Sequence, residues 1–96
     1  MNKPVIIVEG TSDVNKLQNL VDADFVITNG SCVSRETILY IKELSSKRVI
    51  LIMTDPDYPG MRIRALIKNE VPNAIDVFVD KSKSSLGISS FLCFAR

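Results

Sequence analysis

The strongest constraint on the fold is the alternation of short apolar runs with segments of helical periodicity. The apolar runs cover residues 4–8, 25–27, 49–53 and 75–79. Each is short and rich in β-branched or aromatic side chains, so each predicts a buried strand. Apolar side chains recur at helical spacing in residues 13–21, 35–44 and 59–69. Strands that alternate with helices in this way predict an α/β domain with a parallel sheet and right-handed crossovers.

The four expected strands form one sheet. Because unbroken apolar runs suit strands covered on both faces, we expect a Rossmann-like parallel sheet in the order 2-1-3-4, with helices on both faces. A length of 96 residues and a hydrophobic fraction of 46% fit a single domain with its own core. The alternation ends near residue 80, and the apolar segment 86–96 has no clear period. That segment is compatible with a short helix, a strand or a tail that lacks its natural continuation.

The composition excludes several classes of protein. Because the chain has no histidine, Ser-His catalysis, Cys-His catalysis and imidazole metal ligands are all excluded. Cys32 and Cys93 lack the spacing of a zinc motif and are too few for a secreted disulfide scaffold. The apolar runs are too short for a membrane span or a signal peptide, so we expect a cytoplasmic protein with no membrane partner.

Two carboxylates follow the third expected strand. Asp55 and Asp57 lie in the sequence T-D-P-D-Y-P-G, residues 54–60, between an apolar run and a helix. Side chains two residues apart in an extended segment point the same way. Two like charges about 4 Å apart repel by roughly 4 kcal/mol at an effective dielectric near 20. The pair therefore requires a cation, a proton or full hydration, and the alternative is that both residues are solvated turn residues without a ligand.

A third carboxylate favours the cation. Glu9 ends the first strand, which neighbours the third in the order 2-1-3-4, so it should meet the aspartates where open α/β sheets bind ligands. Asp13 can lean over the same site, or it can serve only the helix dipole. Carboxylates of this kind suit Mg²⁺ or Mn²⁺. If the four acids converge, the rest of the chain carries 12 basic and 7 acidic residues, which suits a divalent metal and a phosphate polymer.

These motifs resemble a known family. The pattern Glu9-Gly10-x-x-Asp13 after a first strand, with Asp55-x-Asp57 after a third, is similar to that of the Toprim domain, which occurs in topoisomerases, primases, recombination proteins and certain nucleases. Longer stretches, at residues 8–10, 21–24, 28–31 and 54–60, resemble the ribonuclease M5 family of bacterial endonucleases. The resemblance covers roughly residues 4 to 80.

The resemblance implies an activity and a set of roles. It implies a Mg²⁺-dependent endoribonuclease that hydrolyses phosphodiesters of precursor 5S rRNA during 5S rRNA maturation, with a 5S-binding ribosomal protein shaping the substrate. Glu9 would be the general acid/base or a metal-linked carboxylate, Asp55 and Asp57 metal ligands, and Asp13 a support for the metal. We expect residues 1–80 to form the Toprim catalytic domain and residues 81–96 a divergent or truncated tail, without the family's C-terminal RNA-binding domain.

Glycines and a turn add candidate contacts with phosphate or RNA. Gly10 and Gly60 allow the backbone to approach a ligand closely. Asn29, Gly30 and Ser31 follow the second strand on the same sheet edge as the carboxylates. Their backbone N–H groups and the Ser31 hydroxyl can hold a phosphate, or the three residues are a simple turn.

Three side chains near the acidic loop are further candidates for RNA contacts. Tyr58 can stack on a base or ribose, or it can simply cover the loop. Arg62 and Arg64 follow on the next helix, where they contact phosphates or form an ordinary solvated face.

Two other functions compete with the endoribonuclease. The first is a Toprim module that binds metal and nucleic acid but does not catalyse a reaction. The second is a Toprim protein of DNA metabolism, of the primase or recombination type. The sequence T-D-P-D-Y-P-G argues against the second, and comparison of DNA and RNA substrates separates it from the ribonuclease.

Overall fold

The sheet has a parallel core of four strands. The computed structural model describes residues 3–29, 33–79 and 92–95. Its elements are β1 (Val5–Val8), α1 (Thr11–Leu17), β2 (Asp24–Ile27), α2 (Arg35–Ser45), β3 (Ile50–Ile52), α3 (Tyr58–Glu70), β4 (Ile75–Val79) and β5 (Leu92–Ala95). The strand order is β2-β1-β3-β4-β5, and the first four strands are parallel, which confirms the predicted α/β fold and the order 2-1-3-4.

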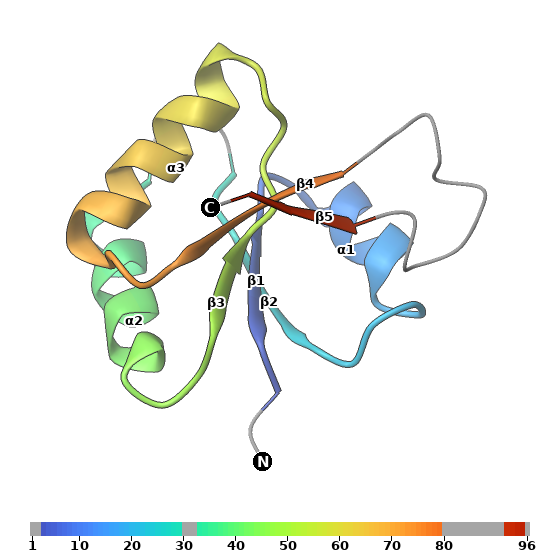
Figure 1. Ribbon diagram of the computed structural model, residues 1–96, viewed down its shortest axis with the longest axis horizontal. Helices are drawn as coiled ribbons and strands as arrows, with labels where there is room; N and C mark the ends of the chain where they lie inside the picture. The colour runs from blue at the N-terminus through green and yellow to red at the C-terminus, as the bar shows by residue number, and fades with distance from the viewer. Residues whose placement is uncertain (1–2, 30–32, 80–91, 96) are drawn as a thin grey trace.

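β1 lies inside the sheet and is buried on both faces. Val5 and Ile7 point into a core with α2 and α3, which includes Ile41 and Ile63. Ile6 and Val8 point into the second core, and α1 covers this face with Leu17. Figure 1 shows α2 and α3 on one side of the sheet and α1 on the other. The prediction of helices on both faces is therefore confirmed, and the alternation along β1 explains why its whole sequence is apolar.

The first helix is shorter than the sequence predicts. It begins at Thr11, after Gly10, which has no side chain to cap a helix. The backbone N–H groups of Leu20 and Val21 both donate to the carbonyl of Leu17, which ends the helix in a turn. Leu20 is consequently 52% exposed and does not extend the buried stripe.

The second helix begins where the sequence predicts. Ser34 is extended, and its side-chain Oγ accepts a hydrogen bond from the backbone N–H of Thr37 at 3.1 Å. This bond satisfies one of the N–H groups that have no partner within the helix itself.

Replacing the capping serine should destabilise the chain. We expect Ser34→Ala to lower the free energy of unfolding by about 1 kcal/mol, because the cap is lost and an amide must find water instead. Denaturant unfolding measures the change. Ser12→Ala is the matched control, since Ser12 is exposed in the first turn of α1 and should change stability little. Equal losses in the two variants would contradict the assignment of the cap.

β5 extends the sheet beyond the parallel core. It pairs antiparallel with β4, in a register that runs from Asp76↔Ala95 to Val79↔Leu92. Of the three alternatives left open for the last segment, residues 92–95 therefore form a strand. The expected boundary between residues 80 and 81 lies outside the described residues, so the division into a catalytic domain and a tail stays a prediction. Within the described part of the chain, no helix is long and apolar enough to cross a membrane.

Candidate active site at the carboxyl ends of β1 and β3

The parallel sheet brings Glu9 to the acidic loop. β1 pairs with β3 in the register Ile7↔Ile52, and the N–H of Met53 donates to the carbonyl of Ile7 at 2.9 Å. Glu9 therefore reaches the start of the loop that follows β3. Its Oε2 accepts a hydrogen bond from the backbone N–H of Asp55 at 3.2 Å, across 46 positions of sequence. The structure thus places the carboxylate from β1 against the loop from β3.

Asp57 takes part in the start of α3. Its Oδ1 accepts a hydrogen bond from the N–H of Gly60 at 2.8 Å, and Pro59 occupies the first helical turn, where its fixed φ is suited to a helix. Asp55 and Asp57 are both exposed. A carboxylate has two oxygens, each with two lone pairs, so an N-cap hydrogen bond does not prevent it from binding a cation.

Of two further predicted residues, Asn29 lies beside Glu9, and Asp13 lies in the helix that follows Glu9. Asp13 is half-buried in the first turn of α1. Asn29 is exposed, adopts a left-handed backbone with φ of 61°, and donates its N–H to the carbonyl of Glu9 at 3.0 Å. Gly30 and Ser31, the other residues of the predicted phosphate turn, lie outside the described residues.

The glycines differ in their surroundings. Apart from its two chain neighbours, no described residue has an atom within 4 Å of a Cβ built at Gly10. A Cβ built at Gly60 would lie 1.8 Å from the carbonyl oxygen of Asp55. Gly60 is buried, and its close approach is to the protein's own loop. Glycine is therefore required at this position by the contact with the loop, and not by the expected approach of its backbone to a ligand.

The donor set fits a hard divalent cation. Glu9, Asp55 and Asp57 offer carboxylate oxygens at one edge of the sheet, which are the ligands that Mg²⁺ and Mn²⁺ prefer. In the conformation seen here, no three acidic or cysteine side chains among the described residues are close enough together to hold a metal ion. Because like charges repel in the absence of a cation, binding would require the exposed side chains of Asp55 and Asp57 to turn toward Glu9.

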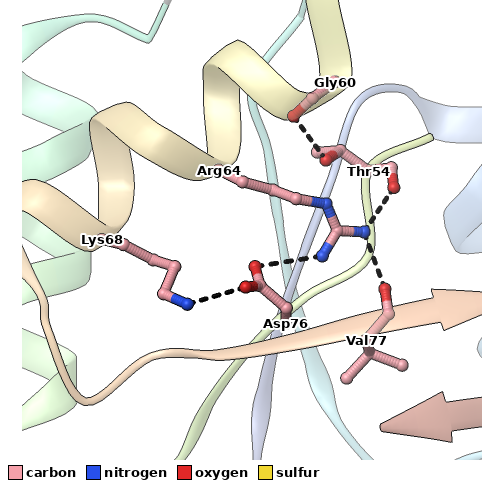
Figure 2. A network of polar contacts seen from close by, with 6 residues as sticks. All are labelled: Thr54, Gly60, Arg64, Lys68, Asp76 and Val77. Atoms are coloured by element: carbon pink, nitrogen blue, oxygen red, sulfur yellow. Dashed lines mark hydrogen bonds and ion pairs between the residues drawn. The ribbon is translucent and has the colours of Figure 1, made fainter. Parts of the chain in front are cut away.

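Arg64 corrects the sequence analysis. Its side chain is not at the surface, since the residue is only 2% exposed. Both predictions for Arg64, a contact with phosphates and a place on a solvated face, are therefore wrong. The guanidinium donates to the Asp76 carboxylate at 3.2 Å and to the carbonyls of Thr54 and Val77 at 2.5 and 2.7 Å, as Figure 2 shows. It also lies over the Phe78 ring, 4.0 Å from the centroid.

The other two candidates for RNA contacts are at the surface. Tyr58 is 78% exposed at the start of α3, and Arg62 is exposed on the same helix. Both are therefore accessible to a nucleic acid that approaches the acidic loop.

Asp76 is the acidic partner of two cations from α3. Lys68 donates to its Oδ2 at 2.7 Å, and Arg64 donates to its Oδ1 (Figure 2). Burial raises the pKa of Asp76, but the hydrogen bonds from Lys68 and then Arg64 outweigh burial and hold this pKa below its ordinary value. A charged residue inside a buried strand needs such partners. This requirement is the sequence signal that could have identified Arg64, which lies on the inner face of α3 with Gly60 and Ile67.

The lowered pKa predicts acid sensitivity. The unfolded chain takes up a proton on Asp76 near pH 3.9, whereas the folded chain does so at a lower pH. The stabilising contribution is therefore complete above that pH and is lost as the pH falls toward the folded pKa. Urea unfolding between neutral pH and about pH 3 should show a smaller loss of stability for Asp76→Asn than for the unmodified chain. An identical pH dependence in the two chains would contradict this assignment.

A pocket of about 760 Å³ lies at the other end of the sheet. Its lining includes Lys3, Asp24, Tyr40 and Arg48, which lie at or near the amino ends of the strands or on α2. Arg48 and Lys3 approach the Asp24 carboxylate to 2.6 and 3.8 Å. This pocket is on the opposite side from the carboxylates, so it takes no part in the candidate site.

Comparison with known proteins agrees with the fold. The model of the Toprim domain family matches residues 4–81. The chain therefore belongs to the Toprim family. A solved small Toprim domain protein from Bacillus stearothermophilus has the same fold, with a TM-score of 0.73 and 24% identity over 85% of this chain and 73% of that chain.

Among its relatives are the ribonucleases M5. The chain is 42% identical to ribonuclease M5 of Bacillus cereus over 82 residues, which are 85% of this chain and 43% of the relative. It is 40% identical to ribonuclease M5 1 of Ligilactobacillus salivarius over 92 residues, which are 90% of this chain and 48% of the relative. The chain thus spans about half the length of these relatives.

Proposed function

We propose that the chain is a Mg²⁺-dependent endoribonuclease domain that cuts precursor 5S rRNA during 5S rRNA maturation. The observation that carries the proposal is the hydrogen bond between the Glu9 carboxylate and the Asp55 amide, which joins the two acidic motifs at the carboxyl edge of the sheet. The similarity to the ribonucleases M5 supports the substrate. The site of action is then the cytoplasm, where ribosomal RNA of bacteria matures.

Each carboxylate has a role in this reaction. Asp55 and Asp57 hold Mg²⁺, with Mn²⁺ as a possible substitute, and Asp13 supports the site from α1. The bound metal supplies charge neutralisation at a non-bridging phosphate oxygen. Glu9 takes the proton from the attacking water or binds the metal as well, because carboxylates are the evident bases in a chain without histidine. The Asp55 amide holds the Glu9 carboxylate toward the loop for this task.

The surface around the site suits an RNA strand. Tyr58 is exposed beside the loop and stacks on a base or ribose. Arg62 pairs with phosphates. Because the Asn29 N–H already donates to the Glu9 carbonyl, a further phosphate is held by the N–H groups of Gly30 and Ser31 and by the Ser31 hydroxyl. A 5S-binding ribosomal protein is the proposed partner that shapes the precursor for cleavage.

A cleavage assay tests the proposal. The chain is incubated with precursor 5S rRNA, Mg²⁺ and the 5S-binding ribosomal protein, and the products are mapped on a sequencing gel. We expect a discrete cut in a double-stranded part of the precursor that disappears with a chelator and returns with Mg²⁺ or Mn²⁺. A DNA duplex of the same sequence should remain intact.

Each competing function gives a different result. Mg²⁺-dependent binding of RNA without cleavage would contradict the enzyme and support a non-catalytic Toprim module. Cleavage of DNA in preference to RNA would support a protein of DNA metabolism. No binding of either metal or RNA would contradict all three functions.

A further inference from the structure

One peptide group connects the buried arginine to the candidate base. The carbonyl oxygen of Thr54 accepts from Arg64 Nη2 at 2.5 Å, and the N–H of Asp55 donates to Glu9 Oε2 at 3.2 Å. The carbonyl of Thr54 and the N–H of Asp55 belong to the same peptide unit. In a trans peptide these two groups point in opposite directions within one plane, so fixing one of them fixes the other. We propose that Arg64 is a positioning residue, which orients Glu9 at the metal site through the Thr54–Asp55 peptide.

The arginine is held firmly enough to act as an anchor. Its Nη2 also donates to the Val77 carbonyl at 2.7 Å, and its Nη1 donates to Asp76 at 3.2 Å. With its guanidinium also resting on Phe78, the side chain is bound to β4 on several sides. Figure 2 shows it reaching from α3 between β4 and the segment after β3. The Thr54 carbonyl therefore meets a donor whose position is set by the core.

The charges at the two ends of the Thr54–Asp55 peptide favour both of its hydrogen bonds. A cation lies at the carbonyl end of the peptide, and a carboxylate lies at its N–H end. Hydrogen bonds in such a chain polarise and strengthen one another. Burial holds the pKa of Arg64 below its usual value, while Asp76 and, less strongly, the charges of Glu9 and Asp55 favour the charged guanidinium.

Pairing with Asp76, which Lys68 also contacts, does not by itself require an arginine here. Its Nε is buried, and no residue in the described ranges accepts a hydrogen bond from it. An unsatisfied buried donor costs about 1–3 kcal/mol. Buried ion pairs are often no more stabilising than apolar side chains of similar volume. A role in orienting the loop explains why position 64, on the inner face of α3, is an arginine and not another isoleucine.

The test measures the Asp55 amide and the metal affinity. The inference takes its metal from the proposed function. The Asp55 amide resonance is therefore measured by NMR, independently of the metal, and the affinity for Mg²⁺ is measured separately. In Arg64→Met and Arg64→Lys, the amide proton should shift upfield, toward a weaker hydrogen bond. The affinity for Mg²⁺ should fall about tenfold or more, as when groups that orient metal ligands are removed.

Lys68→Met is the matched control. It breaks the second cation contact of Asp76 without removing the hydrogen bond from Arg64 to Thr54, so it should leave the Asp55 amide and the Mg²⁺ affinity unchanged. A folded Arg64→Met chain with an unchanged amide resonance and unchanged affinity would overturn the proposal. Equal changes in Lys68→Met would also overturn it, since a general effect on packing would then suffice.

If the Arg64 variants do not fold, a reciprocal experiment still tests the proposal. Glu9 lies at the half-exposed end of β1, so Glu9→Gln should remain folded. It should shift the guanidinium nitrogen resonances of Arg64, whereas Asp13→Asn, which removes a carboxylate on α1, should shift them less. Unchanged guanidinium resonances in Glu9→Gln would contradict the proposal. If these shifts occur but the unmodified chain cuts no RNA, the positioning role stands and the proposed reaction fails.

Discussion

Glu9→Gln should lower the rate of Mg²⁺-dependent cleavage of precursor 5S rRNA by at least about 100-fold, because general acid–base catalysis contributes about 10²–10⁴-fold. Glutamine keeps the size of the side chain and can still accept a hydrogen bond from the Asp55 amide, so the fold and the loop should change little. What is lost is a negative charge and a group that can take up a proton. Single-turnover cleavage rates measure the effect.

Two further variants make this result specific. Asp55→Asn should cause a loss at least as large, because it removes the charge of a proposed metal ligand from the loop. Asp22→Asn is the matched control: its carboxylate is 91% exposed and lies 3.6 Å from Lys3, away from the site, and its loss should leave the rate within a factor of about two. If Glu9→Gln and Asp55→Asn both cut at the normal rate, the assignment of the active site is wrong.

Gly60→Ala should lower the free energy of unfolding by about 3 kcal/mol, the upper part of the range for overpacking in a well-packed region. The added Cβ would lie 1.8 Å from the Asp55 carbonyl oxygen, 2.8 Å from the Asp55 carbonyl carbon and 3.0 Å from Asp57 Oδ1. Two of these atoms are backbone, so the loop or the start of α3 must move. Because the loop carries the two proposed metal ligands, Mg²⁺ affinity should fall with stability.

The control for this variant is the other glycine of the site. A Cβ built at Gly10 meets nothing within 4 Å in the described structure, and its φ of −152° is open to any residue. Gly10→Ala should therefore cost less than about 1 kcal/mol, the scale of an N-cap change. Urea unfolding and calorimetric Mg²⁺ titration of both variants separate the two positions. Similar behaviour of the two variants would show that steric contact at Gly60 does not hold the loop.

The fold was predictable because its strands are short and largely apolar, and β1 is buried on both faces. In a parallel sheet covered by helices, every residue of β1 is apolar, and the run at residues 75–79 coincides with β4. The end of α1 was not predictable from periodicity, because Leu20 continues the apolar spacing and yet lies in a turn after the helix. The spacing of apolar residues predicts which side chains share a face of a helix, but it does not predict the residue at which the helix ends.

The site was predictable as far as sheet topology determines it. Neighbouring parallel strands bring Glu9 and Asp55 together once the order 2-1-3-4 is assumed, and their hydrogen bond agrees with that expectation. The roles of Gly60 and Arg64 were not predictable in the same way. Both depend on contacts between α3 and the loop after β3, and the sequence gives no distance between those two segments. A positive charge on a helix is usually solvated, and only its acidic partner in β4 indicates that this one is buried.

The most direct test of the metal site is anomalous diffraction from crystals of the chain soaked in Mn²⁺. The account predicts an anomalous peak at the carboxyl edge of the sheet, bound by oxygens of Asp55 and Asp57 with Glu9 as a ligand or hydrogen-bonded beside it. The peak should be absent from crystals of Asp55→Asn. A fully occupied peak elsewhere on the molecule, with none at this edge, would contradict the account.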